Sequence, residues 1–239
     1  MPSILAGAAG ATMRSSKYLR NKIQFFRWLG PACALLFFGF LGGCHSTLIS
    51  AAAAGDLGAA RAILEKDPDA LYEVDENGNT AEVIAILNGR NNVAIYLLDR
   101  GYPVDGPRGS FPPIMACLSR YTRSSTSMLE VLLKRGANPN CYYAKEKWYP
   151  IVLAVNNYMP DKLRLLAAYG ADFRVRDEFG MTPLELAESH LASFANPDCH
   201  LPHGELEDPV YRERRVRAWA EMVALVRDLA SNQRETPGS

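Results

Sequence analysis

The fold of this chain is decided by the stretch FGMTPLELA at residues 179–187. The hydroxyl group of Thr182 can cap the N-terminus of a helix, and Pro183 suits the first helical position. Leu184 and Ala187 then share one face of that helix, with one large and one small side chain. The stretch therefore predicts the start of a helix whose apolar face packs against a neighbouring element.

The same pattern, a cap position followed by an apolar helix start, recurs through the chain. It is found at residues 80–85, 112–117 and 149–154. A second marker is a glycine at the end of an apolar segment. It occurs at Gly101, Gly136 and Gly170, which are spaced by 35 and 34 residues. Two markers with one period indicate a repeated helix pair, which cannot bury its apolar face without stacking on its neighbours.

The repeat resembles the ankyrin repeat, whose period is about 33 residues. The signature Gly-x-Thr-Pro-Leu is nearly complete at residues 180–184, with Glu185 in place of the usual histidine. The tetratricopeptide repeat has a period of about 34 residues, but it needs Trp and Gly-Tyr in its first helix, and this chain lacks them there. The resemblance covers residues 46–230 and implies an all-α solenoid of about five helix-pair repeats.

Departures from the repeat shape the expected domain plan. Asp67 stands where the helix-ending glycine is expected, and three extra residues lie near residues 121–125. We expect a repeat domain at residues 44–230 that contains an insertion at residues 193–210, a capping helix from Tyr211 to Ala230, and a disordered tail at residues 231–239.

The first 43 residues predict an export signal. They hold five basic side chains and no acidic one, and an apolar run extends from Trp28 to Phe40. The run leads into LGGC at residues 41–44, which resembles the lipobox of bacterial lipoproteins. The resemblance implies that Cys44 carries the lipid, and His45 in place of Asp favours the outer membrane, with the protein facing the periplasm. A plain signal peptide or an uncleaved anchor helix is the alternative.

Charge and motifs limit the functions open to this chain. Its 26 basic and 26 acidic residues balance, but five of the basic ones lie in the predicted signal, so the exported part carries a net charge near −5. Nucleic-acid binding requires a clustered basic surface and is not expected. The chain has no Gly-rich phosphate loop and no Gly-x-Ser-x-Gly motif. We therefore expect no enzyme, no cofactor and no small-molecule substrate.

One stretch of the insertion contains residues that can bind metal. CHLPH at residues 199–203 is flanked by Asp198 and Glu205. Zinc needs three or four ligands in a fixed geometry, and the missing second half of a spaced motif counts against such a site. We expect a surface insertion without metal. A disulfide between Cys141 and Cys199 is compatible with an oxidising periplasm, and the sequence leaves it open.

The turns between repeats, called fingers here, fall at residues 75–80, 106–111, 141–149 and 176–181. The finger at residues 141–149 carries four aromatic residues, and Tyr and Trp are enriched at protein-binding hot spots. We expect Tyr149, next to Pro150, to cover the adjacent helix. The candidate binding residues are Tyr142, Tyr143, Lys145, Lys147 and Trp148, flanked by Arg108, Arg176 and Phe179.

These expectations combine into one functional hypothesis. The chain is an exported, non-catalytic module that binds another protein in the bacterial cell envelope and is held to the membrane by the lipid on Cys44. The resemblance implies binding through the finger tips and the inner helices. Three alternatives stay open: an immunity protein that neutralises a toxin delivered to the periplasm, a structural envelope protein, and a metal-dependent hydrolase that uses the insertion.

Overall fold

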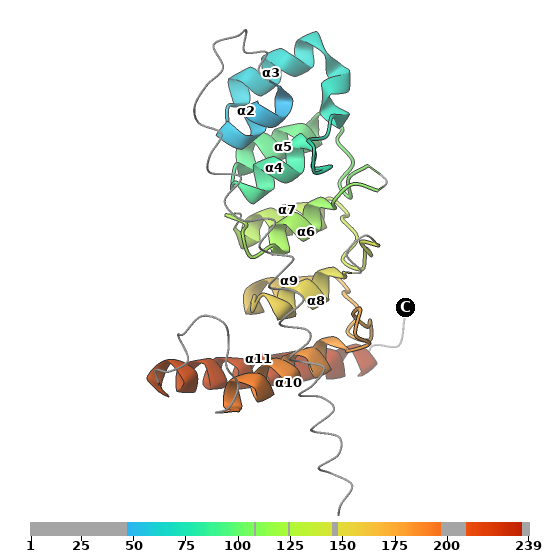
Figure 1. Ribbon diagram of the computed structural model, residues 1–239. Helices are drawn as coiled ribbons and strands as arrows, with labels where there is room; N and C mark the ends of the chain where they lie inside the picture. The colour runs from blue at the N-terminus through green and yellow to red at the C-terminus, as the bar shows by residue number, and fades with distance from the viewer. Residues whose placement is uncertain (1–46, 108, 124, 145–147, 197–208, 236–239) are drawn as a thin grey trace, which may run out of the picture. The chain divides into compact units, whose positions relative to one another are not determined.

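The computed structural model describes residues 47–107, 109–123, 125–144, 148–196 and 209–235 (Figure 1). All regular elements in these ranges are helices, joined by turns that contain two isolated β-bridges. The predicted all-α class is confirmed for these residues. The chain divides into two compact units, the repeat unit at residues 45–177 and a C-terminal unit that contains the described residues from Glu178 onward.

The repeat unit is a stack of helix pairs, each with an inner and an outer helix (Figure 1). Each inner helix contacts the next one, while α3 contacts α5 and α7 contacts α9. Because both helix types bury apolar residues, neighbouring pairs share one continuous core. The inner helices are α2 (Leu48–Ala54), α4 (Ala81–Leu87), α6 (Pro113–Leu118) and α8 (Pro150–Asn156). The outer helices are α3 (Leu57–Lys66), α5 (Asn91–Asp99), α7 (Thr126–Lys134) and α9 (Pro160–Ala168).

The glycine marker of the sequence corresponds to a left-handed residue after each outer helix. Gly101, Gly136 and Gly170 have φ of 97°, 90° and 84°, a conformation that costs glycine little. Asp67 at the equivalent place has φ of −139°. The chain there continues instead into a 3₁₀ helix, η1 (Pro68–Tyr72), whose start is capped by the Asp67 carboxylate. The missing glycine therefore changes the local turn and leaves the stack intact.

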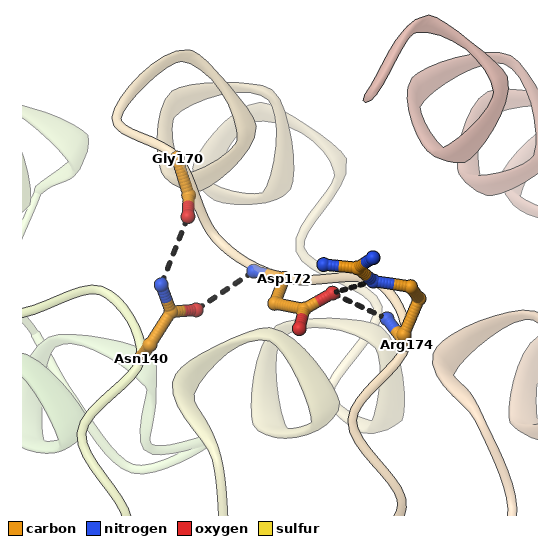
Figure 2. Close-up of polar contacts among 4 residues, drawn as sticks. All are labelled: Asn140, Gly170, Asp172 and Arg174. Carbon is orange, nitrogen blue, oxygen red and sulfur yellow. Dashed lines mark hydrogen bonds and ion pairs between the residues drawn. The ribbon is translucent and has the colours of Figure 1, made fainter. Parts of the chain in front are cut away.

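A ladder of polar groups connects the turns of successive repeats. The Asp105 carboxylate accepts a hydrogen bond of 2.9 Å from the Asn138 amide. The Asn140 side chain then donates to the Gly170 carbonyl over 2.9 Å and accepts from the Asp172 amide over 2.7 Å, as Figure 2 shows. Each contact joins residues about one repeat apart, so the ladder holds neighbouring turns in register.

At the other end of the helices, each repeat satisfies the final carbonyls of the preceding inner helix. Arg90 Nε donates to the Ala53 carbonyl over 3.3 Å, and the Arg123 amide donates to the Leu87 carbonyl over 2.9 Å. Lys162, largely buried, donates its ammonium group to the Cys117 carbonyl over 2.6 Å. Since the last carbonyls of a helix have no partner within it, these contacts stabilise the helix ends and the stacking together.

The C-terminal unit contains α10 (Pro183–Ala195) and α11 (Pro209–Glu235). The prediction that Thr182 caps the first of these helices is confirmed, because Thr182 Oγ1 accepts from the Glu185 amide and the Glu185 carboxylate accepts from the Thr182 amide. The Trp219 ring stacks on His190 and Phe194 of α10, with ring centroids 4.4 and 6.4 Å apart. The buried stripe of α11 consists of Trp219, Met222, Val223 and Val226.

Two predicted boundaries in this unit are wrong. The sequence predicts an insertion at residues 193–210, but residues 193–195 continue α10, and α11 already begins at Pro209. No helix-breaking residue occurs before Asn196, which precedes proline and is therefore disfavoured in a helix. The tail was placed at residues 231–239, but α11 continues to Glu235. No glycine or proline follows Ala230 directly, so the sequence contains no residue that would end the helix there.

Candidate protein-binding surface

The finger at residues 141–149 is held by a short antiparallel bridge. The Tyr143 amide donates to the Trp148 carbonyl over 3.0 Å, and the Trp148 amide donates back over 3.2 Å. In such a pair the two directly opposed side chains share one face, and their sequence neighbours lie on the other. The bridge thus places Tyr143 and Trp148 on one face of the finger, with Tyr142 and Tyr149 on the opposite face.

Each face of this finger carries a packed pair of rings. Phe111 of the preceding finger meets Tyr143 edge to face, with centroids 5.2 Å apart. Tyr142 lies against Tyr149, with centroids 4.9 Å apart. Tyr142 is 49% exposed, whereas the other rings are partly buried. We call these five residues, Phe111, Tyr142, Tyr143, Trp148 and Tyr149, the aromatic cluster.

The structure brings together only some of the predicted binding residues. Tyr142, Tyr143 and Trp148 lie close together on one finger, and Phe111, which is not among the predicted binding residues, packs against Tyr143. Arg176 is exposed in the repeat unit, while Phe179 belongs to the C-terminal unit, so its place beside the finger stays a prediction. Arg108, Lys145 and Lys147 lie outside the described residues.

Tyr149 occupies the N-cap position of α8, in front of Pro150. Its ring is partly buried beneath that of Tyr142. It therefore packs against an exposed ring of the finger as well as preceding the helix that it was expected to cover. A large aromatic side chain that is already held in place loses little entropy when a partner covers it.

Cys141 at the base of the same finger is a partly buried thiol near the Asp105 carboxylate. Burial raises the pKa of Cys141 to about 12, and the nearby Asp105 carboxylate adds to the effect. Because the thiolate is the nucleophilic form, this cysteine is poorly suited to covalent chemistry. Cys141 and the buried Cys117 are not joined to each other by a disulfide. The suggested partner Cys199 lies outside the residues that the structure describes.

A buried carboxyl group was missed by the sequence analysis. Glu82 in the first turn of α4 is fully buried, and neither carboxylate oxygen has a hydrogen-bond partner within the described part of the chain. Burial raises the pKa of Glu82 well above its ordinary value, and the Arg135 charge opposes this only in part. At the same place in the next two inner helices stand Ile114 and Ile151. Aligning the repeats in the sequence places these three residues at one position, where Glu82 is the only charged residue of the three.

Two further predicted features, the lipid-bearing cysteine and the metal candidate, lie outside the residues that the structure describes. These are Cys44 and residues 199–203. Among the described residues, no helix is long and apolar enough to cross a membrane. No group of three or more metal-binding side chains is found in that same part of the chain. The lipid and metal expectations are therefore neither supported nor contradicted.

Residues 48–98 match the family described as ankyrin repeats (many copies). The chain is 36% identical over 91 residues to the ARF GTPase-activating protein Git of Drosophila melanogaster, a match that covers 36% of this chain and 12% of that protein. It is 35% identical over 97 residues to a protein of Acanthamoeba polyphaga mimivirus named as an ankyrin repeat protein, covering 37% of this chain and 26% of that one. The chain thus spans a minor part of either relative.

The helix pairs, the turn geometry and these matches define an ankyrin-repeat fold. Proteins of this class are generally non-catalytic modules that bind other proteins. The name of the fly protein describes a GTPase-activating role. That role belongs to the fly protein as a whole, and the match covers only 12% of it.

Proposed function

We propose that this chain is an exported, lipid-anchored ankyrin-repeat module that binds a protein in the bacterial cell envelope. The aromatic cluster carries the proposal, with Tyr142 at its exposed side. The Tyr143–Trp148 bridge orders the finger, and Tyr149 supports the Tyr142 ring. A pre-ordered aromatic surface binds a partner at low entropic cost, which is the usual basis of an interface hot spot.

The lipid anchor is proposed from the sequence. The basic segment, the apolar run and LGGC at residues 41–44 have the order of a lipoprotein signal. Changing Cys44 to Ala should abolish the incorporation of labelled fatty acid and leave the precursor uncleaved. Unchanged labelling of this variant would contradict the anchor without affecting the binding proposal.

The binding proposal is tested by removing one ring from each face of the finger, the exposed Tyr142 and the partly buried Trp148. Tyr142→Ala with Trp148→Ala should weaken partner capture, measured by cross-linking in intact cells, by at least tenfold, or about 1.4 kcal/mol. We leave Tyr143 in place because its ring packs against Phe111. The matched control is Tyr72→Ala with Tyr169→Ala, since both tyrosines are exposed outside this finger. If the finger variant stays folded and captures the partner at full strength, the binding site lies elsewhere.

A further inference from the structure

The repeat unit has a second distinctive edge, where the inner helices end and the outer helices begin. Arg90, in the turn between α4 and α5, lies against Gly55 of the preceding repeat. A Cβ atom added to Gly55 would come within 2.8 Å of Arg90 Cδ. Arg90 Nε also bonds the Ala53 carbonyl. The arginine side chain is thus held in place by the backbone beneath it.

The next repeat places Arg123 in the same way. A Cβ atom added to Gly89 would lie 2.9 Å from the Arg123 carbonyl oxygen and 3.1 Å from its Cβ. The Arg123 amide bonds the Leu87 carbonyl, and Thr122 Oγ1 donates to the Ile86 carbonyl over 3.3 Å. Arg123 therefore lies directly beside the turn that carries Arg90.

This part of the third repeat contains its three extra residues. They lengthen the connection between α6 and α7, and they expose Arg120 and the Tyr121 side chain, which is 50% accessible. A turn closed by the Thr122 amide on the Ser119 carbonyl orders the loop. The corresponding connections in the second and fourth repeats are shorter and carry no pair of arginines.

Two arginines of this edge, Arg90 and Arg123, have exposed side chains. Within the described residues, the guanidinium groups of Arg90 and Arg123 form no ion pair with a carboxylate. Two acidic residues lie on the same edge. Asp56 caps α3 by accepting from the Ala59 amide, and Asp161 pairs with Arg164.

We propose that Arg90, Arg120, Tyr121 and Arg123, named here the arginine edge, bind an acidic segment of a protein. Arginine pairs with carboxylates through two parallel hydrogen bonds, and Arg and Tyr are the residues most enriched at protein hot spots. An anionic bilayer is a poorer match. Three arginines without lysine give a membrane affinity weaker than about 1 mM. This inference does not depend on the aromatic cluster.

A peptide assay tests the recognition. A short fluorescein-labelled peptide rich in Glu and Tyr is titrated with the protein at low salt, beside a version with Gln in place of Glu. Arg120→Glu with Arg123→Glu should weaken binding of the Glu peptide at least tenfold. The control, Arg100→Glu with Arg214→Glu, makes the same change of charge on exposed arginines that do not belong to this edge and should bind as the unmodified protein does. Equal binding of both peptides, unchanged binding by the edge variant, or no binding by the unmodified protein would overturn the proposal.

Cross-linking in cells identifies what covers this edge. A photo-reactive amino acid in place of Tyr121 should form an adduct with an acidic protein segment, and one in place of Tyr169 should not. An adduct with lipid or with an uncharged segment would overturn the proposal, as would the absence of any adduct. Anionic vesicles that bind the unmodified protein, but not Arg120→Glu with Arg123→Glu, would also overturn it in favour of a membrane.

Discussion

The second and fourth repeats have the same pair of helices but differ in where an atypical residue lies. In the second repeat it is a carboxyl group in the core, and in the fourth it is a set of aromatic rings on the finger. The second repeat buries the Glu82 carboxyl, and its finger folds on itself because the Asp75 carboxylate accepts from the Asn77 and Asn79 amides. The fourth repeat buries Ile151 at the matching position and presents aromatic rings on its finger. Each repeat is stabilised mainly by its neighbours. The stack therefore tolerates a buried carboxyl group in one repeat and exposed aromatic side chains on the finger of another.

The largest expected effect comes from moving the exception of the second repeat into the fourth. Ile151→Glu should lower the free energy of unfolding at pH 7 by about 3–5 kcal/mol, because Ile151 is buried in α8 and a buried charge without a partner is costly. Urea unfolding followed by circular dichroism would measure it. A loss below about 1 kcal/mol would mean that this register position accepts a carboxyl group in any repeat.

The reverse change should stabilise the second repeat. Glu82→Leu should raise the free energy of unfolding at pH 7 by about 1–3 kcal/mol, since an unpaired buried carboxyl gives way to an apolar side chain. Glu82→Gln is the control, because it removes the charge and retains a polar group.

The gain from Glu82→Leu should depend on pH. The folded-state pKa of Glu82 lies above the ordinary value of 4.5, so the contribution of Glu82 to stability is present below pH 4.5. As the pH rises from there through the folded-state pKa, the unfolded state releases its proton first and the unmodified protein loses stability. The difference between Glu82→Leu and the unmodified protein should therefore shrink toward pH 4. A gain that is constant across pH would show that Glu82 is not buried in the folded state.

A smaller effect is expected at the ladder that precedes the aromatic finger. Asn140→Ala removes the two side-chain hydrogen bonds to the next repeat drawn in Figure 2, at a cost of about 1–2 kcal/mol. Amide hydrogen exchange should rise mainly between Asn140 and Arg174. Uniform loosening that reaches the second repeat would show that these turns do not act locally.

The sequence predicted what depends on local chemistry. The period, the left-handed glycines and the Thr182 cap all follow from backbone preferences of single residues. Contacts between repeats could not be predicted from such local preferences. Phe111 meets Tyr143 only because stacking sets the offset of successive fingers, and no local pattern encodes that distance.

Two further misses have different causes. The side chain of Thr80 does not cap its helix and instead accepts a hydrogen bond of 2.7 Å from the Tyr102 hydroxyl, so a tertiary contact replaced a local one. The end of α11 was placed too early because no glycine or proline marks it before Pro237. Helix ends without a breaker depend on packing, which one sequence does not reveal.

The smallest effect on stability is expected for Cys141, a partly buried ionisable group in the aromatic finger. Its pKa is raised from 9.0 to about 12, so between pH 5 and pH 8 the thiol is protonated in both the folded and unfolded states and stability should not change. Labelling with a thiol reagent at pH 8 should nevertheless be at least about 100-fold slower than in the urea-unfolded chain, because few molecules are thiolate. The difference in labelling between the unmodified protein and Cys141→Ser isolates the contribution of Cys141, because the other four cysteines are the same in both. Rapid labelling of Cys141 in the folded protein would show an exposed thiol, and the contrast between the finger's exposed rings and its partly buried base would then fail.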